Sequence, residues 1–321
     1  MPTTWGILRL CPRRAASAMT ESATQPTAIA VLGPTASGKT ALAEALAARL
    51  GCRIVNADVF QMYRGLDIGT AKPKRRELYD LLDILEPVET FTAGRFVHLA
   101  AERCAAAYEQ GRHVIVCGGT GLYVRALFEG YSLTPPPPSD ERRRLRERLH
   151  QVGIERFAQE SGVDLASLSQ SDRSNPVRVL RAAERLAVEK PRAGTPTPNA
   201  PRWHARRLKF GLLPTREWLL PRIRRRTEEM LALGWEEEVR RLLDAGVSED
   251  SPAFRAIGYR EVAALIRGEV SQEEATGRIK TQTWQYAKRQ LTWLRREPNL
   301  IELTPVEDTT THVEAICGYI S

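Results

Sequence analysis

The sequence predicts an α/β fold with a parallel sheet, and three observations support this prediction. A short apolar run, 28–32, leads into a glycine-rich loop and then into a helical pattern of apolar residues. Two further apolar runs, 52–57 and 112–117, end in an acidic residue and in a glycine turn. Strands that alternate with helices are typical of parallel sheets, and the carboxyl ends of such strands face one ligand crevice.

The loop after the first strand has the G-x-x-x-x-G-K-[ST] pattern of a phosphate-binding loop, in the strand-loop-helix setting that this motif requires. The N–H groups of such a loop converge on an anion at a helix N-terminus. Lys39 adds a positive charge, and the Thr40 hydroxyl is a ligand for a Mg²⁺ cofactor. The predicted anion-binding residues are Gly33, Pro34, Thr35, Ala36, Ser37, Gly38, Lys39 and Thr40. The loop predicts a bound polyphosphate or diphosphate without specifying which, and the alternative is a chance glycine-rich turn.

Asp58 ends the second strand, so we expect it in the same crevice as the loop. From position alone it is either a Mg²⁺-binding carboxylate or a helix cap. Glycines and a proline interrupt 59–73, which predicts an ordered loop. We expect helices over 76–110 with one break at 86–92, and a tight turn at 118–121 that leads into the next helix. From 217 onward the pattern predicts successive helices.

Two proline-rich segments, 135–138 and 191–201, enclose an arginine-rich helical stretch. Proline interrupts helices and inner strands, so we predict a helical insertion over 131–201 and a strand at 207–213 that returns to the sheet. The remaining units are 27–130, the first part of the core, and 202–321, its completion with C-terminal helices. Residues 1–26 are expected to be an unstructured lead, with a transit peptide as the alternative and Met19 as a possible start.

The net charge of +8 favours a polyanionic partner, although basic balance alone is weak evidence. Arginines cluster in the insertion and the later helices, among the aromatic residues Trp203, Trp218, Tyr259, Trp284, Tyr286 and Trp293. Basic surface with stacking partners is typical of RNA recognition, and solvated helix faces are the alternative. Five scattered cysteines fit a reducing cytoplasm, and no apolar run is long enough to cross a bilayer.

Several motifs together resemble the tRNA dimethylallyltransferases (tRNA isopentenyltransferases). The matching pieces are GPTASGKT at 33–40, AD..Q.Y.G.DIGTAKP at 57–73, GGTGLY at 118–123, NP.R..RA at 175–182, GYRE at 258–261 and QYAKRQ.TW at 285–293. The resemblance implies a P-loop NTPase-like core related to nucleotide kinases, with an insertion that grips the anticodon stem-loop of tRNA. The implied reaction moves a dimethylallyl group from dimethylallyl diphosphate to N6 of the adenosine 3′ to the anticodon, position 37, with Mg²⁺.

The resemblance also implies roles for individual residues. The loop would bind the leaving diphosphate, with Lys39, Thr40 and Arg222 beside it. Asp58 would be the general base. The implied tRNA-binding residues are Asp58, Val59, Phe60, Gln61, Thr120, Arg142, Val177, Arg178 and Arg181. We expect a cytoplasmic monomer with no membrane partner.

Three positions depart from the family pattern: Asn56 and Val59 replace common serines, and Trp284 replaces a frequent arginine. These departures affect the contacts expected of the neighbouring loops. They leave the implied general base, Asp58, unchanged. Three alternatives stay open: an adenylate isopentenyltransferase that acts on a free nucleotide, a small-molecule kinase, and an ATP-gated RNA-binding protein. The basic insertion favours tRNA over a free nucleotide.

Overall fold

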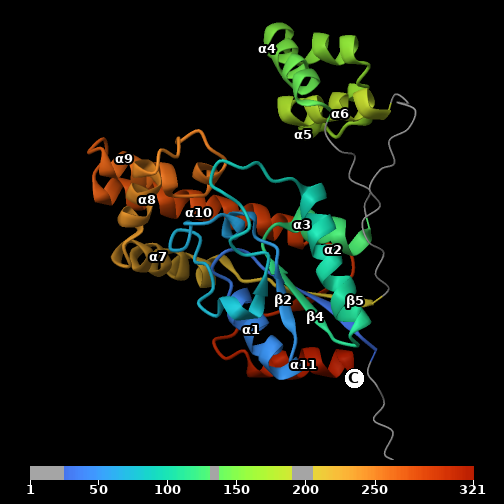
Figure 1. Ribbon diagram of the computed structural model, residues 1–321, viewed down its shortest axis with the longest axis vertical. Coiled ribbons are helices and arrows are strands. Elements are labelled where there is room, and N and C mark those ends of the chain that lie inside the picture. The colour runs from blue at the N-terminus through green and yellow to red at the C-terminus, as the bar shows by residue number, and fades with distance from the viewer. Residues whose placement is uncertain (1–24, 131–136, 190–204) are drawn as a thin grey trace, which may run out of the picture.

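The computed structural model describes residues 25–130, 137–189 and 205–321. Its sheet has the strand order β3-β2-β4-β1-β5-β6, and every neighbouring pair is parallel (Figure 1). The strands are β1 (Thr27–Leu32), β2 (Arg53–Asn56), β3 (Tyr79–Asp80), β4 (Val114–Gly118), β5 (Arg206–Leu212) and β6 (Leu300–Leu303). The predicted parallel α/β fold is confirmed, and so is the return of the chain to the sheet through β5, which pairs with β1.

Helices cover both faces of the sheet, so every residue of the central strand β1 is buried. The helices are α1 (Lys39–Leu50), α2 (Ala93–Glu109), α3 (Gly121–Glu129), α4 (Ser139–Ser161), α5 (Gln170–Arg173), α6 (Pro176–Glu189), α7 (Arg216–Ala232), α8 (Trp235–Asp244), α9 (Tyr259–Ile266), α10 (Gln272–Leu294) and α11 (Thr310–Ile320). Helices α1 and α11 pack on one face, and α2 and α3 pack on the other.

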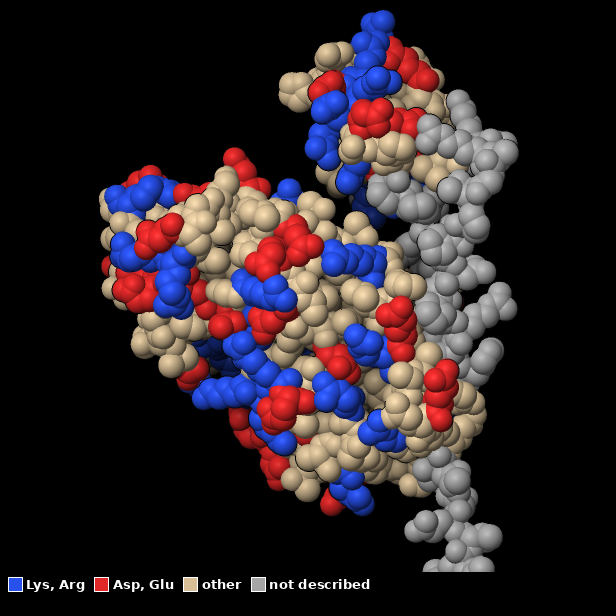
Figure 2. All heavy atoms as spheres, in the orientation of Figure 1, with Lys and Arg blue, Asp and Glu red and all other residues tan. Residues whose placement is uncertain are grey.

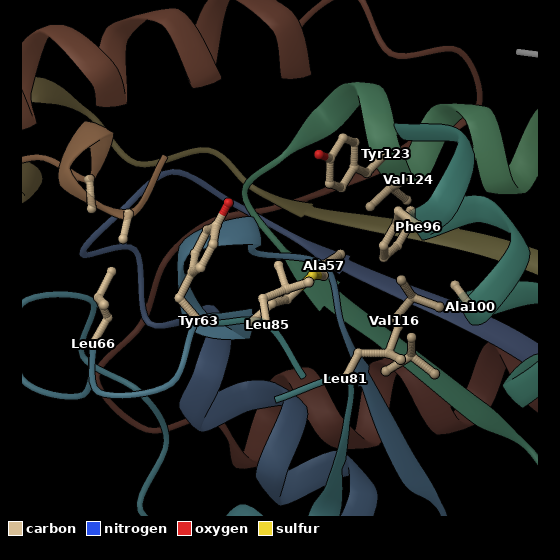
Figure 3. Close-up of a cluster of buried hydrophobic side chains, with 14 of the residues drawn as sticks. Ala57, Tyr63, Leu66, Leu81, Leu85, Phe96, Ala100, Val116, Tyr123 and Val124 are labelled. Atoms are coloured by element: carbon tan, nitrogen blue, oxygen red, sulfur yellow. The ribbon is translucent and has the colours of Figure 1, made fainter. Parts of the chain in front are cut away.

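The larger core lies between the sheet and helices α2 and α3, close to where the strands end. Figure 3 shows Ala57, which follows β2, and Val116 of β4 in one cluster with Phe96 of α2 and Tyr123 of α3. The rings of Phe96 and Tyr123 stack with their centroids 4.8 Å apart. This packing fixes the strand ends that carry the polar residues described below.

Helices α4, α5 and α6 form a separate group beside the sheet-containing core (Figure 1). They bury their own small apolar cluster, in which Phe157 is fully buried. Gly153 interrupts α4 with φ 73° and ψ 174°, which turns the second half of the helix back onto α6. The predicted helices up to Glu189 are confirmed. The boundaries at 131 and 201, the first half of the proline-rich segment 135–138, the whole of 191–201 and residues 1–24 lie outside the described residues.

The prediction of helix over 76–85 is wrong, whereas the predicted break at 86–92 is confirmed. These residues form a 3₁₀ turn (Arg76–Leu78), the short strand β3 and a loop before α2 begins at Ala93. Leu81 and Asp83 have φ of 65° and 53°, which no right-handed helix contains. Strand β6 was also not predicted, because the sequence was interpreted as helical throughout its last third. None of the helices in the described residues has the length and apolar composition needed to cross a bilayer.

Candidate active site

The phosphate-binding loop connects β1 to α1. Gly38 has φ 92° immediately before α1, and Ala36 has φ 62°. A Cβ at Gly33 would lie 2.5 Å from the Ser37 hydroxyl, so glycine is required there. The Ser37 hydroxyl is buried and has no hydrogen-bond partner within the described residues. A buried hydroxyl without a partner at a helix N-terminus suits a site that takes an anion.

Lys39 reaches back over its own loop, and its Nζ donates a hydrogen bond to the Pro34 carbonyl at 3.3 Å. Burial lowers the pKa of Lys39, the neighbouring Cys117 and Asp58 raise it, and Arg226 lowers it again. These couplings place the ammonium near both the Asp58 carboxylate and the Arg226 guanidinium. A buried cation held near a second cation is favourable when an anion lies between them.

Asp58 follows β2, and its carboxylate begins the 3₁₀ turn Val59–Met62. The oxygen Oδ1 accepts a hydrogen bond from the Phe60 amide at 3.1 Å, so the predicted helix-cap role is confirmed. The Asn56 side chain fixes the backbone on both sides of Asp58: it accepts from the Asp58 amide and donates to the Asp58 carbonyl, both at 3.0 Å. Oδ2 of Asp58 accepts no hydrogen bond within the described residues and is available for chemistry.

Arg226 of α7 is a site residue that the sequence analysis did not single out. Burial lowers its pKa, while the charges of Asp58 and Glu229 raise it. Its Nη2 donates to the Thr70 carbonyl at 3.4 Å. Arg222, one helical turn earlier, instead pairs with Glu307 at 2.5 Å, and its guanidinium lies 4.6 Å from the Trp218 ring centroid. The role of Arg222 at a diphosphate therefore stays a prediction.

Comparison with known proteins decides the family. The family model described as IPP transferase matches residues 61–297. This chain belongs to the IPP transferase family. A tRNA dimethylallyltransferase from Geobacter metallireducens is 42% identical over 284 residues, covering 85% of this chain and 91% of that protein. The tRNA dimethylallyltransferase from Thermomicrobium roseum is 41% identical over 275 residues, covering 84% and 83%. The full-length tRNA isopentenylpyrophosphate transferase of Bacillus halodurans has a TM-score of 0.67 at 32% identity, covering 92% of this chain and 95% of that structure.

In this IPP transferase, two of the resembling motifs build the scaffold of the site. The buried carboxylate of Glu238 accepts hydrogen bonds from the amides of Asp67 and Ile68 at 2.7 Å, from the amide of Gly69 at 3.0 Å and from the Tyr259 hydroxyl at 2.7 Å. A Cβ at Gly69 or at Gly258 would lie within 2.2 Å of the Trp235 ring. The motifs at 66–73 and 258–261 are thus packed together around Trp235 and Glu238.

The predicted tRNA contacts Val59, Phe60 and Gln61 lie on the 3₁₀ turn after Asp58, and all three are partly buried. The Gln61 amide donates to the carbonyls of Thr70 and Ala71 at 3.2 and 3.3 Å, so it supports the scaffold loop. Thr120 precedes α3 and lies beside Tyr286 of α10. Burial and the Asp58 charge raise the pKa of Tyr286, while Arg289 and polar contacts with Thr120 and Gln290 lower it. Thr120, Tyr286 and Asp58 therefore face one region.

The four predicted tRNA contacts in the insertion lie on α4 and α6. Arg142 and Arg181 both pair with the buried Glu184, at 2.8 and 2.9 Å. Arg178 is exposed and lies 3.7 Å from Asp172. Val177 is 71% exposed. Figure 2 shows Lys and Arg gathered on the insertion, on the side where Figure 1 places α4.

A basic cleft of about 760 Å³ separates the insertion from α10 of the IPP transferase core. Its cations are Arg125, Arg178, Lys288, Arg289 and Arg296. Among the aromatic residues expected to stack on RNA, Trp218, Trp284, Tyr286 and Trp293 are half-buried, and Trp293 lines the cleft. Tyr259 is fully buried, so that part of the prediction is wrong, and Trp203 lies outside the described residues.

The donor set around the loop fits a Mg²⁺ ion that is held chiefly by a bound diphosphate. No group of three or more His, Cys, Asp or Glu that could hold a metal occurs in the described ranges. Thr40 follows Lys39 in the first turn of α1, and Asp58 is the carboxylate whose charge raises the pKa of Lys39. Mg²⁺ commonly keeps several waters and takes one carboxylate or hydroxyl together with substrate phosphates, and these residues can supply that set.

Proposed function

We propose that the protein transfers the dimethylallyl group of dimethylallyl diphosphate to N6 of the adenosine next to the anticodon on its 3′ side, position 37 of tRNAs. The chain belongs to a family whose similar members are named tRNA dimethylallyltransferases. The observation that carries the proposal is the electrostatic coupling of Asp58 to Lys39 of the phosphate-binding loop and to Arg226. The proton acceptor would be Asp58, and the cations that bind the anion would be Lys39 and Arg226.

The cations would act on the leaving group. As the allylic C–O bond breaks, negative charge grows on the diphosphate. The loop N–H groups, Lys39 and Arg226 would surround that charge, and donors held in place before the reaction stabilise a transition state strongly. Lys39 would exchange its hydrogen bond to the Pro34 carbonyl for one to the diphosphate.

Asp58 would act on the acceptor. The exocyclic amine of adenosine is a weak nucleophile, because its lone pair is delocalised into the ring. As the C–N bond forms, Oδ2 of Asp58 takes the proton that N6 loses, while Oδ1 stays fixed by the Phe60 amide. A positioned base typically contributes about 10²–10⁴-fold.

When bound, Mg²⁺ would neutralise part of the diphosphate charge. The hydroxyl of Thr40 is the ligand that this chain would offer to the ion, and the Asp58 carboxylate would hold one of its waters. Ser37 can donate its unpartnered hydroxyl to the same anion.

The basic cleft between α10 and the insertion would hold the anticodon stem-loop. Phosphate contacts by Arg and Lys supply most of the affinity for nucleic acids, and five cations line the cleft. The target base must leave its stack to reach Asp58. Thr120 and the turn that carries Val59, Phe60 and Gln61 would then border it. We further infer that the enzyme works as a monomer, since the cleft is formed within one chain, and that it works in the reducing cytoplasm, which its scattered cysteines fit.

Labelled dimethylallyl diphosphate, offered with tRNA, with AMP or with neither, tests the proposal. Label that enters tRNA alone supports it. Label that enters AMP indicates an adenylate isopentenyltransferase, and transfer of the γ-phosphate from ATP to a small molecule indicates a kinase. Either result overturns the proposed reaction, and so does tRNA that binds but takes up no label.

A further inference from the structure

Helix α10 packs directly onto the glycine turn that follows β4. A Cβ at Gly119 would lie 2.1 Å from Nε2 of Gln290, and a Cβ at Gly121 would lie 2.2 Å from the Trp293 ring. Gln290 and Trp293 are three residues apart and so share one face of the helix. The turn is glycine-rich because this face of α10 occupies the space that side chains would need.

Gln290 is buried on that face, and both halves of its amide are engaged. Oε1 accepts a hydrogen bond from the Thr35 amide at 2.9 Å, and Nε2 donates to the Gly119 carbonyl at 3.0 Å. Pro34 and Thr35 form what we call the crest of the phosphate-binding loop. Gly119 precedes Thr120, the residue that would border the acceptor base. One side chain therefore joins the two loops between which the transfer would occur.

The contacts of the Pro34 carbonyl and the Thr35 amide indicate what the Gln290 side chain would do when an anion is bound. The crest is held at Pro34 by Lys39 and at Thr35 by Gln290. An anion in the loop competes for the Lys39 ammonium and withdraws it from Pro34. After that exchange Gln290 is the side chain that still holds the crest.

We propose that Gln290 is a positioning residue, which keeps the crest of the phosphate-binding loop at a fixed distance from the Gly119–Thr120 turn. The proposal rests on the proposed function for what the two loops hold. Gln290 touches neither reacting atom and acts through Thr35 and Gly119. Its amide is suited to the task because it accepts on one side and donates on the other, which neither Leu nor Glu does.

Gln290→Leu tests the proposal, with Gln282→Leu as the matched control. Gln282 lies on the same helix and donates to Glu261, away from both loops. We expect Gln290→Leu to weaken binding of pyrophosphate with Mg²⁺ about tenfold, the loss of roughly 1.4 kcal/mol. The KM for dimethylallyl diphosphate should rise and kcat should fall, while the Kd for tRNA and the melting temperature stay close to those of Gln282→Leu.

Pyrophosphate affinity and KM that match the control would overturn the proposal. A fall in pyrophosphate affinity, tRNA affinity and melting temperature together would also overturn it, because that pattern indicates a purely structural residue. Since pyrophosphate binding does not depend on which group is transferred, these outcomes are separate from the labelling result that tests the function.

Hydrogen exchange in the unsubstituted protein gives a second test that does not depend on the folding of a variant. With pyrophosphate and Mg²⁺ bound, the Thr35 amide should exchange slowly, since it is donated to Gln290. Exchange of Thr35 as fast as that of exposed loop amides would contradict the proposal.

Discussion

At the residue scale, Asp58 caps a turn and is also the proposed general base. One carboxylate oxygen caps the 3₁₀ turn through the Phe60 amide, and the other has no partner within the described residues. Asn56 holds the backbone of Asp58 from both sides, so the family departure at position 56 supports the base. Capping fixes the carboxylate, which is what a general base requires.

Asp58→Asn separates the two roles, because an Asn side chain keeps the capping oxygen and loses the basicity. We expect turnover to fall about 10²–10⁴-fold. The affinity for tRNA, measured by filter binding, should stay within a few fold. Asp58→Ala removes the cap as well, so its thermal stability should be lower than that of Asp58→Asn. If Asp58→Asn lost tRNA affinity as strongly as turnover, a base role would be contradicted.

The lowered pKa of Lys39 predicts how diphosphate binding depends on pH. Burial lowers the pKa of Lys39 in the free protein, and an anion bound against the ammonium raises that pKa again. Binding therefore favours the protonated form. Affinity for pyrophosphate should be full below the lowered pKa and should fall as the pH rises through it, towards the higher pKa of the complex.

Calorimetric titrations at a series of pH values measure this dependence. Lys39→Arg is the control, because an arginine side chain stays protonated throughout the range. The ratio of the two affinities cancels the ionisation of pyrophosphate itself. An identical pH profile in both proteins would show that Lys39 does not titrate on binding.

The residues of the site differ in how far the sequence could predict them. The phosphate-binding loop and Asp58 were predicted, because a contiguous motif and a strand end fix their places. Arg226 was missed, since Arg222 and Arg224–226 look alike until the direction of α7 is known. Gln290 was missed because its two contacts lie 255 and 171 residues away in sequence. Such contacts leave no local pattern.

At the element scale, the strands predicted from sequence were those in the interior of the sheet and the strand that returns from the insertion. Strands β3 and β6 lie at the two edges and were not predicted. The two residues of β3 are too few to show alternation, and pairing is assisted by Arg53, which bonds the Tyr79 carbonyl and the Asp80 carboxylate. Edge pairing of this kind depends on tertiary contacts rather than on propensity.

We expect the Glu238 carboxylate to stabilise the loop at 67–73. Glu238→Ala leaves three amides and the Tyr259 hydroxyl buried without their acceptor, and each such group costs about 1–3 kcal/mol. We expect the free energy of unfolding in urea to fall by about 3 kcal/mol or more. Because Arg226 and Gln61 both bond the Thr70 carbonyl, pyrophosphate affinity should fall too.

Glu237→Ala is the control for this measurement, since Glu237 is an exposed neighbour on α8 that lies 3.7 Å from Arg240. Its effect should stay within about 0.5 kcal/mol. Equal unfolding energies for the two variants would mean that the buried carboxylate does not support the loop.

At the scale of the whole molecule, the proposed reaction divides the binding of its two substrates between two groups of elements. The sheet-containing core carries the phosphate-binding loop and the proposed base, while the insertion packs around its own apolar cluster. The basic cleft is lined by both, with Arg178 from the insertion and the remaining four cations from α3, α10 and the residues just after it. Changes in the cleft can therefore alter tRNA binding without altering the diphosphate site.

Replacing Arg178, Lys288 and Arg289 together by Ala should weaken tRNA binding and make it less dependent on salt. Each phosphate contact contributes roughly 0.7–0.9 to the slope of log affinity against log salt, so we expect the slope to fall by about 2–3. Pyrophosphate affinity should not change. Arg224→Ala with Arg225→Ala is the control, because both arginines are exposed on α7, outside the cleft, and pair with Glu228 and Glu229. Titrations at stepped salt concentrations measure both slopes, and a control that loses as much slope as the triple variant would indicate diffuse electrostatic attraction instead of a binding cleft.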